Sequence, residues 1–212
     1  TFTNKAAAEM RTRIEALLGI PVNNLWVGTF HGLAHRLLRR HWREARLPQS
    51  LQILDDDDQQ RLVRRLIREQ KLDEQRWVPR EVQKFINAQK DEGRRSKKMD
   101  DRGDPTRQQL IRLYALYEAR CEQAGVVDFA ELLLRSFETL RDVPDLGEYY
   151  RERFRHLLVD EFQDTNGIQY DWLKQLTGKT GAPFVVGRDG RVQARFAPTT
   201  APDDPAFVAA IE

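Results

Sequence analysis

The chain is organised around the stretch His156-Leu-Leu-Val-Asp-Glu-Phe-Gln-Asp-Thr-Asn166. Residues 157–159 form an apolar run that is long enough for a buried strand and too short for a helix. Thr165 and Asn166 are good helix N-caps. Apolar residues then recur at helical spacing, at Ile168, Trp172, Leu173 and Leu176. The predicted order is therefore strand, acidic turn, helix, and in open α/β sheets ligands bind just outside the carboxyl ends of the strands.

Four polar residues follow the predicted strand: Asp160, Glu161, Gln163 and Asp164. An Asp that ends a buried hydrophobic strand is the Walker B arrangement, in which the carboxylate holds Mg²⁺, usually through water, against the phosphates of a nucleoside triphosphate. We therefore assign Asp160 to the metal and Glu161 to the attacking water. Gln163 would sense the γ-phosphate, and Asp164 would tie the site to neighbouring loops. The alternative is a solvated acidic turn that caps the next helix, and spacing alone does not decide between the two.

The composition is that of one large domain or two small ones, with enough chain to bury a core. Of the 212 residues 32% are charged, but the net charge is only +2, so overall charge does not indicate a nucleic-acid-binding protein. The basic residues are nevertheless clustered. Residues 31–47 contain five arginines against one acid, Glu44, and residues 94–98 contain four basic residues. Such patches can follow a phosphate backbone, although a solvated helix face is the simpler explanation of each one.

The single cysteine, Cys121, excludes an internal disulfide framework and fits a reducing cytosol. It lies on an apolar stripe without a His or Cys nearby in sequence, so we expect a core thiol and not a nucleophile. No apolar run approaches membrane-spanning length and no signal peptide is visible, so we expect a cytoplasmic protein with no membrane partner. The chain opens with Thr1 in the middle of a pattern, which suggests a fragment.

Two further strand-to-helix junctions are predicted near the N-terminus. Residues 1–3 end a strand and lead into a helix that Asn4 caps and Gly19 terminates. The buried face of this helix would consist of Ala7, Met10, Ile14, Leu17 and Leu18. Residues 25–30 form a second short strand before a helix that starts at His31. Backbone N–H groups at such junctions can grip phosphates, and an aromatic ring there can stack on a base.

Between these junctions and the acidic turn the pattern is almost wholly helical. Apolar stripes at helical spacing predict four helices, at residues 62–67, 82–86, 110–124 and 129–140. The acidic run at residues 55–58 lacks the Gly and the final Glu of a calcium loop and suits a helix N-terminus. Residues 91–105 are polar and contain glycines, which predicts a mobile surface loop. A last clear strand is predicted at residues 183–187.

The order of these elements, α/β then helices then α/β, is typical of a helical subdomain inserted between strands of one sheet. Gly178-Lys179-Thr180 is the nearest approach to a phosphate-binding loop. A Walker A loop needs a Gly five residues before its Gly-Lys pair, and Leu173 stands there. We therefore exclude this segment as a phosphate loop.

Four segments, in this order, resemble motifs of the UvrD/Rep/PcrA superfamily 1 DNA helicases. Residues 1–7 (TFTNKAA) resemble motif Ia, and residues 28–38 (GTFHGLAHRLL) resemble the next DNA-contacting motif. Residues 127–134 (VDFAELLL) look like the Asp-Phe-x-x-Leu-Leu element of the family's helical insertion. Residues 158–166 (LVDEFQDTN) are similar to motif II. The resemblance runs from Thr1 to about Gly187.

This resemblance implies an ATP-driven 3′-to-5′ DNA helicase and translocase that acts in DNA repair, with ATP and Mg²⁺ as cofactors. The fold class would be α/β: a partial RecA-like P-loop NTPase domain with a large inserted all-helical subdomain. Residues 1–30 and 149–187 would be the two parts of the ATPase domain, and residues 31–148 would be the insertion. The implied partners are single-stranded DNA, duplex junctions and DNA repair proteins.

The resemblance also implies roles for individual residues. Asp160, Glu161 and Gln163 would be catalytic, with Asp164 added in nucleotide binding. The single-strand track would consist of Phe2, Thr3, Asn4, Lys5, Thr29, Phe30 and His31. The basic insertion would approach duplex DNA.

The sequence also departs from the family. The family's Walker A loop precedes motif Ia and is not among these residues, so we expect the isolated chain to be inactive. Residues 188–212 resemble instead the C-terminal hairpin and helix of glutathione peroxidases, with a strand pair around Asp189-Gly190 and a helix from about Asp204. Residues 192–196 could pair with a sheet edge. The alternative functions are a non-catalytic DNA-binding fragment and a thiol peroxidase-related chimera.

Overall fold

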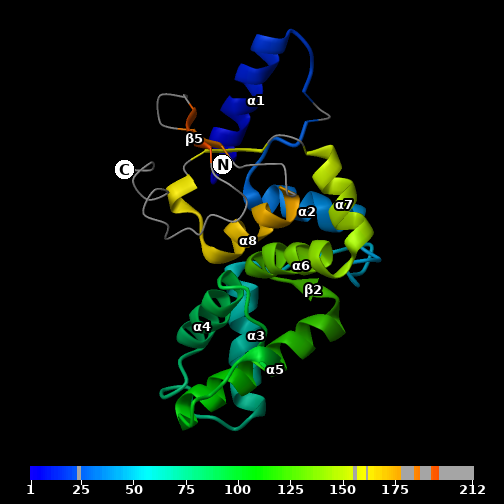
Figure 1. The fold of residues 1–212 in the computed structure, drawn as a ribbon. Coiled ribbons are helices and arrows are strands. Elements are labelled where there is room, and N and C mark those ends of the chain that lie inside the picture. The colour runs from blue at the N-terminus through cyan, green and yellow to red at the C-terminus, as the bar shows by residue number, and fades with distance from the viewer. Residues whose placement is uncertain (23–24, 155–156, 161, 178–183, 187–191, 196–212) are drawn as a thin grey trace. The chain divides into compact units, whose positions relative to one another are not determined.

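The computed structural model describes residues 1–22, 25–154, 157–160, 162–177, 184–186 and 192–195 (Figure 1). The chain divides into two compact units: residues 1–37 with 136–212 form unit 1, and residues 38–135 form unit 2. The described residues are mostly helical, with two small sheets that each contain a parallel strand pair. Each unit is described by itself below.

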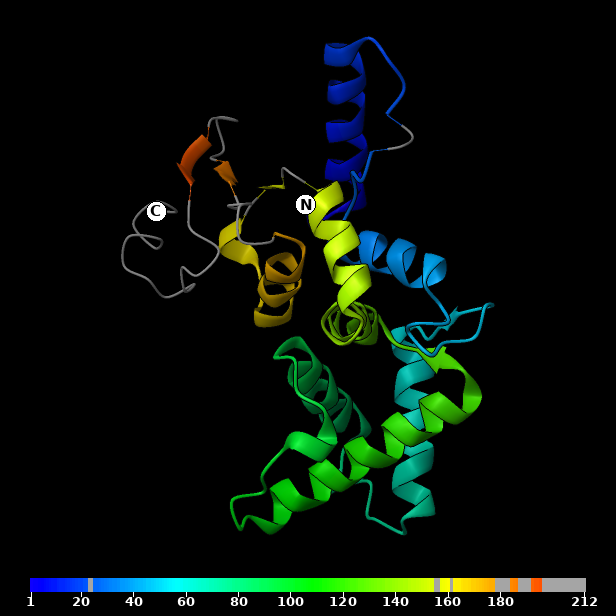
Figure 2. The same ribbon diagram turned by 45° about the vertical axis from the view of Figure 1, so that its right-hand side comes forward.

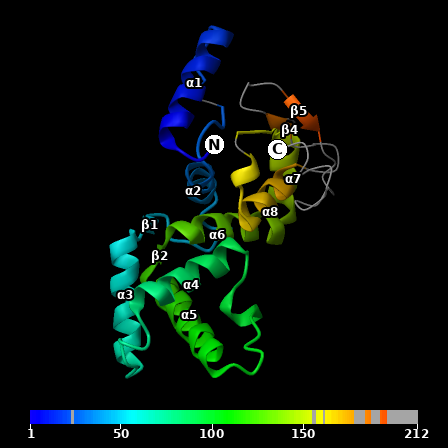
Figure 3. The same cartoon turned by 90° about the vertical axis from the view of Figure 1, so that its left-hand side faces the viewer.

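Three helices make up most of unit 2: α3 (Asp56–Glu69), α4 (Pro79–Asp91) and α5 (Pro105–Ala124). They pack side by side, as Figures 2 and 3 show from two directions. Their shared core contains Val63, Leu66, Ile67, Val82, Ile86, Leu113, Tyr114 and Tyr117. These residues fall on the predicted apolar stripes, which are thereby confirmed. Removal of such side chains from water drives the packing, at roughly 1.5–3 kcal/mol for each large apolar group.

The ends of these helices follow local rules. Asp55 caps α3 by accepting a hydrogen bond from the Asp58 backbone N–H, with more acids in the first turn, so the acidic run has the predicted place. α4 and α5 both begin with a Pro at the first helical position. Gly125 ends α5 in the left-handed conformation, with φ 67°, directly after the predicted helix at residues 110–124.

A two-stranded parallel sheet joins distant parts of unit 2. β1 (Gln52–Ile53) pairs with β2 (Val126–Val127), and the Leu54 N–H donates to the Val127 carbonyl at 2.7 Å. β2 leads directly to α6 (Phe129–Asp142), the helix on which the chain leaves unit 2. Strands of two residues carry no readable alternation, and sequence analysis did not predict them.

Unit 1 contains the acidic strand. β3 (Leu158–Asp160) pairs in parallel with β4 (Phe184–Val186), which pairs antiparallel with β5 (Val192–Arg195). This pairing confirms the predicted strands within residues 157–159 and 183–187, and confirms that the segment beginning at Val192 joins a sheet edge. The antiparallel pair of β4 and β5 flanks Asp189-Gly190, around which a strand pair was predicted. Asp189-Gly190 itself and the predicted helix from Asp204 lie outside the described residues.

In the described part of unit 1, four helices lie wholly or largely within the unit: α1 (Asn4–Leu18), α2 (Phe30–Arg40), α7 (Pro144–Arg153) and α8 (Gly167–Leu176). α7 packs against α8. The buried face of α8 consists of Ile168, Gln169, Trp172, Leu173 and Leu176, which includes all four apolar residues predicted for it.

Three predictions about the N-terminal segment are wrong. Residues 1–3 belong to no strand. Residues 25–30 form no strand: Phe30 already begins α2, one residue before the predicted start, and the carbonyls of Leu25 and Val27 accept hydrogen bonds from Arg36 at 3.2 Å and from Arg11 at 3.1 Å. The apolar face of α1 is also shorter than predicted, since Leu17 is 85% exposed and Leu18 is 55% exposed. Helical spacing alone does not show where along a helix the core ends.

Among the described residues, no helix combines the length and the apolar character needed to cross a membrane.

Candidate functional site

The acidic turn begins where the backbone of unit 1 leaves its sheet. Asp160 is the last residue of β3, lies opposite Val186 of β4, and is half-buried. The Thr1 hydroxyl donates to Asp160 Oδ2 at 3.4 Å, which brings the N-terminal segment to the acidic strand across 159 residues of sequence. A carboxylate and a hydroxyl are hard oxygen donors of the kind that Mg²⁺ takes. Asp160 is thus the described residue that would hold the predicted magnesium ion, although no group of three or more His, Cys, Asp or Glu side chains that could hold a metal lies among the described residues.

The turn after Asp160 is held by short-range hydrogen bonds. Phe162 begins the 3₁₀ turn η2 (Phe162–Asp164), is buried, and contacts the Tyr170 ring edge-on at 6.2 Å. The Thr165 hydroxyl donates to the Phe162 carbonyl at 2.8 Å. Asn166 then starts α8 with a reciprocal capping box to Gln169. The turn is thus closed by a side-chain hydrogen bond and is followed directly by a capped helix.

Three more residues were predicted to bind the nucleotide: Glu161, Gln163 and Asp164. Glu161 lies outside the described residues. Gln163 is described only by its backbone, within η2, and Asp164 is exposed at the end of that turn.

The first predicted DNA-contacting segment is a helix start. Thr3, and not Asn4 as predicted, is the N-cap of α1: its hydroxyl accepts from the Ala6 N–H at 3.1 Å. The helix begins one residue earlier than expected because the Thr hydroxyl satisfies this N–H first. Asn4 and Lys5 are exposed in the first turn. Phe2 is half-buried, with its ring 5.4 Å from that of Phe30.

The second predicted segment starts α2 in the same way. The Thr29 hydroxyl accepts from the Gly32 N–H at 3.1 Å, and the Thr29 carbonyl accepts from the Leu33 N–H. Phe30 is only 5% exposed and packs against Phe2 and Trp172. In this structure the Phe30 ring contacts the half-buried Phe2 and the buried Trp172 and is not exposed to solvent.

His31 is half-buried at the start of α2. Burial lowers the pKa of its imidazole below the ordinary value of 6.5, because the charged form loses hydration. At neutral pH His31 is therefore an uncharged hydrogen-bonding group. Of the predicted track, Thr3, Asn4 and Lys5 are exposed, and Phe2, Thr29 and His31 are partly accessible.

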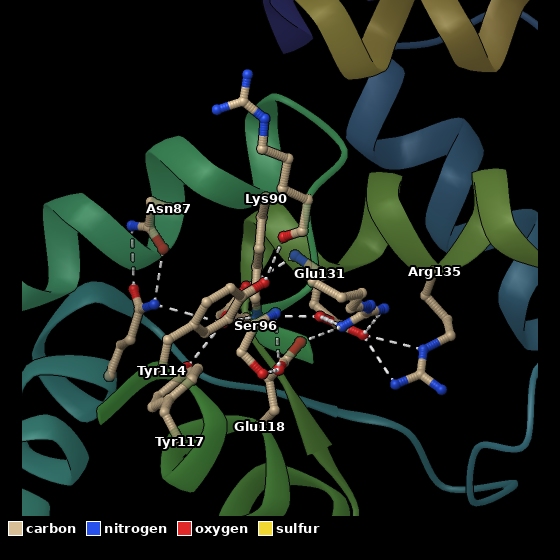
Figure 4. Close-up of polar contacts among 12 residues, drawn as sticks. Asn87, Lys90, Ser96, Tyr114, Tyr117, Glu118, Glu131 and Arg135 are labelled. Atoms are coloured by element: carbon tan, nitrogen blue, oxygen red, sulfur yellow. Dashed lines mark hydrogen bonds and ion pairs between the residues drawn. The ribbon is translucent and has the colours of Figure 1, made fainter. Parts of the chain in front are cut away.

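A buried charge network in unit 2 was not predicted (Figure 4). The Lys90 ammonium, on α4, lies 2.6 Å from Asp128 Oδ2 and 3.0 Å from Glu131 Oε2. All three side chains are at most 6% exposed. Tyr117 donates its hydroxyl to Asp128 at 2.7 Å, and the Gln59 amide donates to it at 3.3 Å. Asp128 also accepts from the Glu131 N–H at 2.7 Å and so begins α6.

The network continues to the segment after α4. Arg95 makes two parallel hydrogen bonds to Glu131, each 2.8 Å, and an ion pair with Glu118 at 3.2 Å. Ser96 donates its hydroxyl to Glu118. Residues 91–105 were predicted to be a mobile surface loop, and this is wrong for Arg95 and Ser96, which are buried. The ion pairs with distant carboxylates bring this polar segment into the interior, and local composition does not reveal such partners.

The pKa values follow from this pairing. Burial alone would lower the pKa of the Lys90 ammonium, but the charges of Glu131 and Asp128 outweigh burial and raise it. Burial alone would raise the pKa of Glu131, but Lys90 and Arg95 lower it well below its ordinary value. Both groups are therefore charged at neutral pH, and each is paired with two or more oppositely charged groups. This is typical of a structural network and not of a catalytic acid or base.

Cys121 is a free, buried cysteine beside this network, so the predicted core thiol is confirmed. Burial raises the pKa of its thiol to about 11. A thiol in this state is a poor nucleophile at neutral pH.

Comparisons with known proteins bear on these sites. The sequence model of the UvrD/REP helicase N-terminal domain matches residues 1–190. The chain is 54% identical to DNA helicase II of Salmonella typhimurium over 189 residues, and equally so to DNA helicase II of Escherichia coli, in each case covering 89% of the chain and 26% of the relative. It is 32% identical to the ATP-dependent DNA helicase PcrA of Bacillus subtilis over 188 residues, covering 88% of the chain and 25% of that protein. The chain thus spans about a quarter of the length of these relatives, and the family resemblance found in the sequence is confirmed.

Proposed function

Because the chain belongs to the UvrD/REP helicase N-terminal domain family, we propose that it is a segment of an ATP-dependent DNA helicase. In this proposal the protein translocates 3′-to-5′ along single-stranded DNA, with ATP and Mg²⁺ as cofactors, and acts in DNA repair in the bacterial cytosol. The observation that carries the proposal is Asp160 at the carboxyl end of β3, beside parallel β4 and within reach of the N-terminal segment. Curated relatives named as DNA helicases support the substrate assignment.

In this proposal each residue of the acidic turn has a defined task. Asp160 orients Mg²⁺, and Glu161 receives the proton of the attacking water. Gln163 and Asp164 complete the nucleotide site. The metal, when bound, neutralises charge on the phosphates. The residues of this chain position water and hold the proton.

The DNA track is assigned to the two helix starts of unit 1. Thr3, Asn4 and Lys5 supply exposed polar groups at the start of α1. Thr29 and His31 supply them at the start of α2, where the uncharged imidazole accepts or donates a hydrogen bond. Helix N-termini carry unpaired backbone N–H groups that favour phosphate oxygens. Phe2, which is half-buried, replaces Phe30 as the aromatic residue closest to a base in this assignment.

For the 212 residues by themselves we propose DNA binding without ATP turnover. The sequence contains no glycine-rich loop with a lysine to hold the β- and γ-phosphates. Hydrolysis by this chain that disappears in Asp160→Ala would refute this part of the proposal.

The catalytic assignment is tested in a polypeptide of the length of the curated relatives that contains these residues. Glu161→Gln is expected to reduce DNA-stimulated ATP turnover by roughly 10²- to 10⁴-fold, with ATP binding retained. Glu152→Gln, an exposed acid on α7, is the matched control and should leave turnover unchanged. A wild-type turnover rate in Glu161→Gln would remove Glu161 from its assigned role.

A further inference from the structure

Helix α1 has little apolar packing to fix its direction. Of its 15 residues, all of which the structure describes, only Ala7 is buried. The side chains of Leu17 and Leu18, at the far end of the helix, are exposed. The contact between the Phe2 and Phe30 rings attaches α1 at its first end. A rod that is held at one end can still pivot, so a second attachment has to set the angle of α1.

That second attachment is made to the chain between α1 and α2. The Arg11 guanidinium donates to the Val27 carbonyl at 3.1 Å, and the Glu15 carboxylate accepts from the Val22 N–H at 3.1 Å. Arg11 and Glu15 are four residues apart and therefore lie on the same face of α1. We call residues 25–28 the connecting loop. Its backbone is thus bound directly by a side chain of α1.

Helix α2 holds the connecting loop from another side. The Arg36 guanidinium donates to the Leu25 carbonyl at 3.2 Å, and its central carbon lies 4.7 Å from the centroid of the Trp26 ring. A planar guanidinium can donate in its plane and stack through its face at the same time. The Trp26 ring also contacts Tyr150 and Phe154 of α7 edge-on, at 5.5 and 5.2 Å between centroids. Three helices of unit 1 therefore fix the connecting loop.

A neighbouring arginine shows that this use of Arg11 is not general. Arg13, also on α1, pairs with Glu9 of the same helix at 2.6 Å and is 75% exposed. Residues two apart on a helix point in nearly opposite directions, so Arg13 faces away from the side on which Arg11 lies. Arg11 and Arg36 both donate to backbone carbonyls of one loop. That loop runs directly into Thr29, whose hydroxyl caps the start of α2.

We propose that Arg11 and Arg36 are positioning residues of the single-strand track. By holding alternate carbonyls of the connecting loop from two helices, they set the start of α1 against the start of α2, so that one DNA strand meets both. Two contact segments at a fixed spacing bind a strand more tightly than two segments at a variable spacing, because less freedom is lost on binding. The inference rests on the proposed function, and it adds two residues that do not themselves touch the strand.

The test measures the affinity of the 212-residue chain for oligothymidylate of about 12 nucleotides over a range of salt concentrations. Arg11→Gln and Arg36→Gln should each bind about 10-fold more weakly, because each loses a charge-assisted hydrogen bond that holds the loop. The log–log salt slope should stay within about 0.3 of the wild-type value, since neither arginine neutralises a phosphate. A slope that falls by about 0.7 would make that arginine a phosphate ligand and overturn the proposal.

Two single variants serve as controls. Arg13→Gln removes the same charge from α1 and should bind within about twofold of the wild type, because its partner Glu9 lies on the same helix. A loss equal to that of Arg11→Gln would reduce the effect to net charge and refute the positioning role. Arg36→Lys keeps the charge and a donor for the Leu25 carbonyl, and it should recover at least about half of the logarithmic loss. No recovery would show that the bond to this carbonyl does not position the track.

The double variant Arg11→Gln, Arg36→Gln tests whether both arginines act through the same loop. The second substitution should then add little, for a total loss of about 10- to 30-fold, whereas independent roles would multiply to about 100-fold and contradict the proposal. Far-ultraviolet circular dichroism in the binding buffer checks the fold, and a glutamine variant that is unfolded there would show that its arginine maintains the fold as a whole, which also overturns the proposal. A wild-type chain that does not bind the oligonucleotide refutes the proposed function. Wild-type binding with unchanged affinity in both glutamine variants refutes this inference alone.

Discussion

Removal of the buried ammonium of Lys90 should destabilise unit 2 strongly. In Lys90→Met the thioether fills much of the same volume but cannot pair with Asp128 and Glu131, which lie 2.6 and 3.0 Å from the ammonium in the wild type. Glu131 keeps its two hydrogen bonds from Arg95 and its ion pair with Arg135 at 2.9 Å. The charge of Glu131 therefore remains compensated.

Asp128, by contrast, loses its charge compensation in Lys90→Met. It keeps hydrogen bonds from Tyr117, from the Glu131 N–H and from Gln59, but loses the ammonium that is its ion-pair partner among the described residues. An uncompensated charge buried in this way costs about 3–5 kcal/mol. We expect about 3 kcal/mol for Lys90→Met, because the remaining hydrogen bonds still solvate the carboxylate. At a slope of about 2 kcal/mol per molar urea, this moves the unfolding midpoint by about 1.5 M.

The assay is urea unfolding followed by far-ultraviolet circular dichroism, since unit 2 is mostly helical. Lys84→Met is the matched control: Lys84 lies on the same helix, is 61% exposed, and pairs with Glu81 at 2.8 Å. A surface pair of this kind contributes at most about 1 kcal/mol. The double variant Lys90→Met, Asp128→Asn should recover about 1–2 kcal/mol of the free energy of unfolding, because it also removes the uncompensated negative charge of Asp128. A Lys90→Met midpoint close to that of Lys84→Met would refute the reasoning, as would a double variant less stable than the single one.

Two more predictions concern the same unit. Because pairing with Lys90 and Arg95 lowers the pKa of Glu131 from its ordinary value of 4.5, its stabilising contribution is present above that value and is lost as the pH falls below it. The gap in urea midpoint between the wild type and Glu131→Gln should therefore be widest at pH 6 and narrow toward pH 3, and a gap that widens on acidification would contradict the assignment. For Cys121, whose pKa is raised to about 11, only about a thousandth of the thiol is ionised at pH 8. The folded chain should react with a thiol-specific disulfide reagent at least about 100-fold more slowly than the urea-unfolded chain, and comparable rates would show that Cys121 is not a buried core thiol.

Individual helices and strands show which parts of the fold could be predicted from the sequence. The helices of unit 2 were predictable because apolar residues recur every three to four positions and because caps such as Asp55 and Gly125 act on their own backbone neighbours. β3 and β4 were predictable because short apolar runs between turn residues suit buried strands. The stretch at residues 25–30 has the same local appearance, but side chains of Arg11 and Arg36 bind its carbonyls and it forms no strand.

The same distinction between local signals and distant contacts holds for the residues of the candidate site. Asp160 could be identified from its place after an apolar strand, and Thr29 from its place at a helix start. The burial of Phe30 could not, because it depends on Trp172, which is distant in sequence and reaches Phe30 only through the fold.

The sequence by itself determined most of the helices, several of their caps, the strand before the acidic turn and the family, since each depends on residues within a few positions of one another. Only the tertiary structure decided that Lys90 lies beside Asp128, that Arg95 is buried while Arg39, Arg40 and Arg43 remain exposed, and that Thr1 reaches Asp160. The physical reason is that the free-energy cost of burying a charge depends on whether an oppositely charged partner lies beside it in the protein interior. That partner is supplied by a segment tens of residues away, whose position no local pattern specifies.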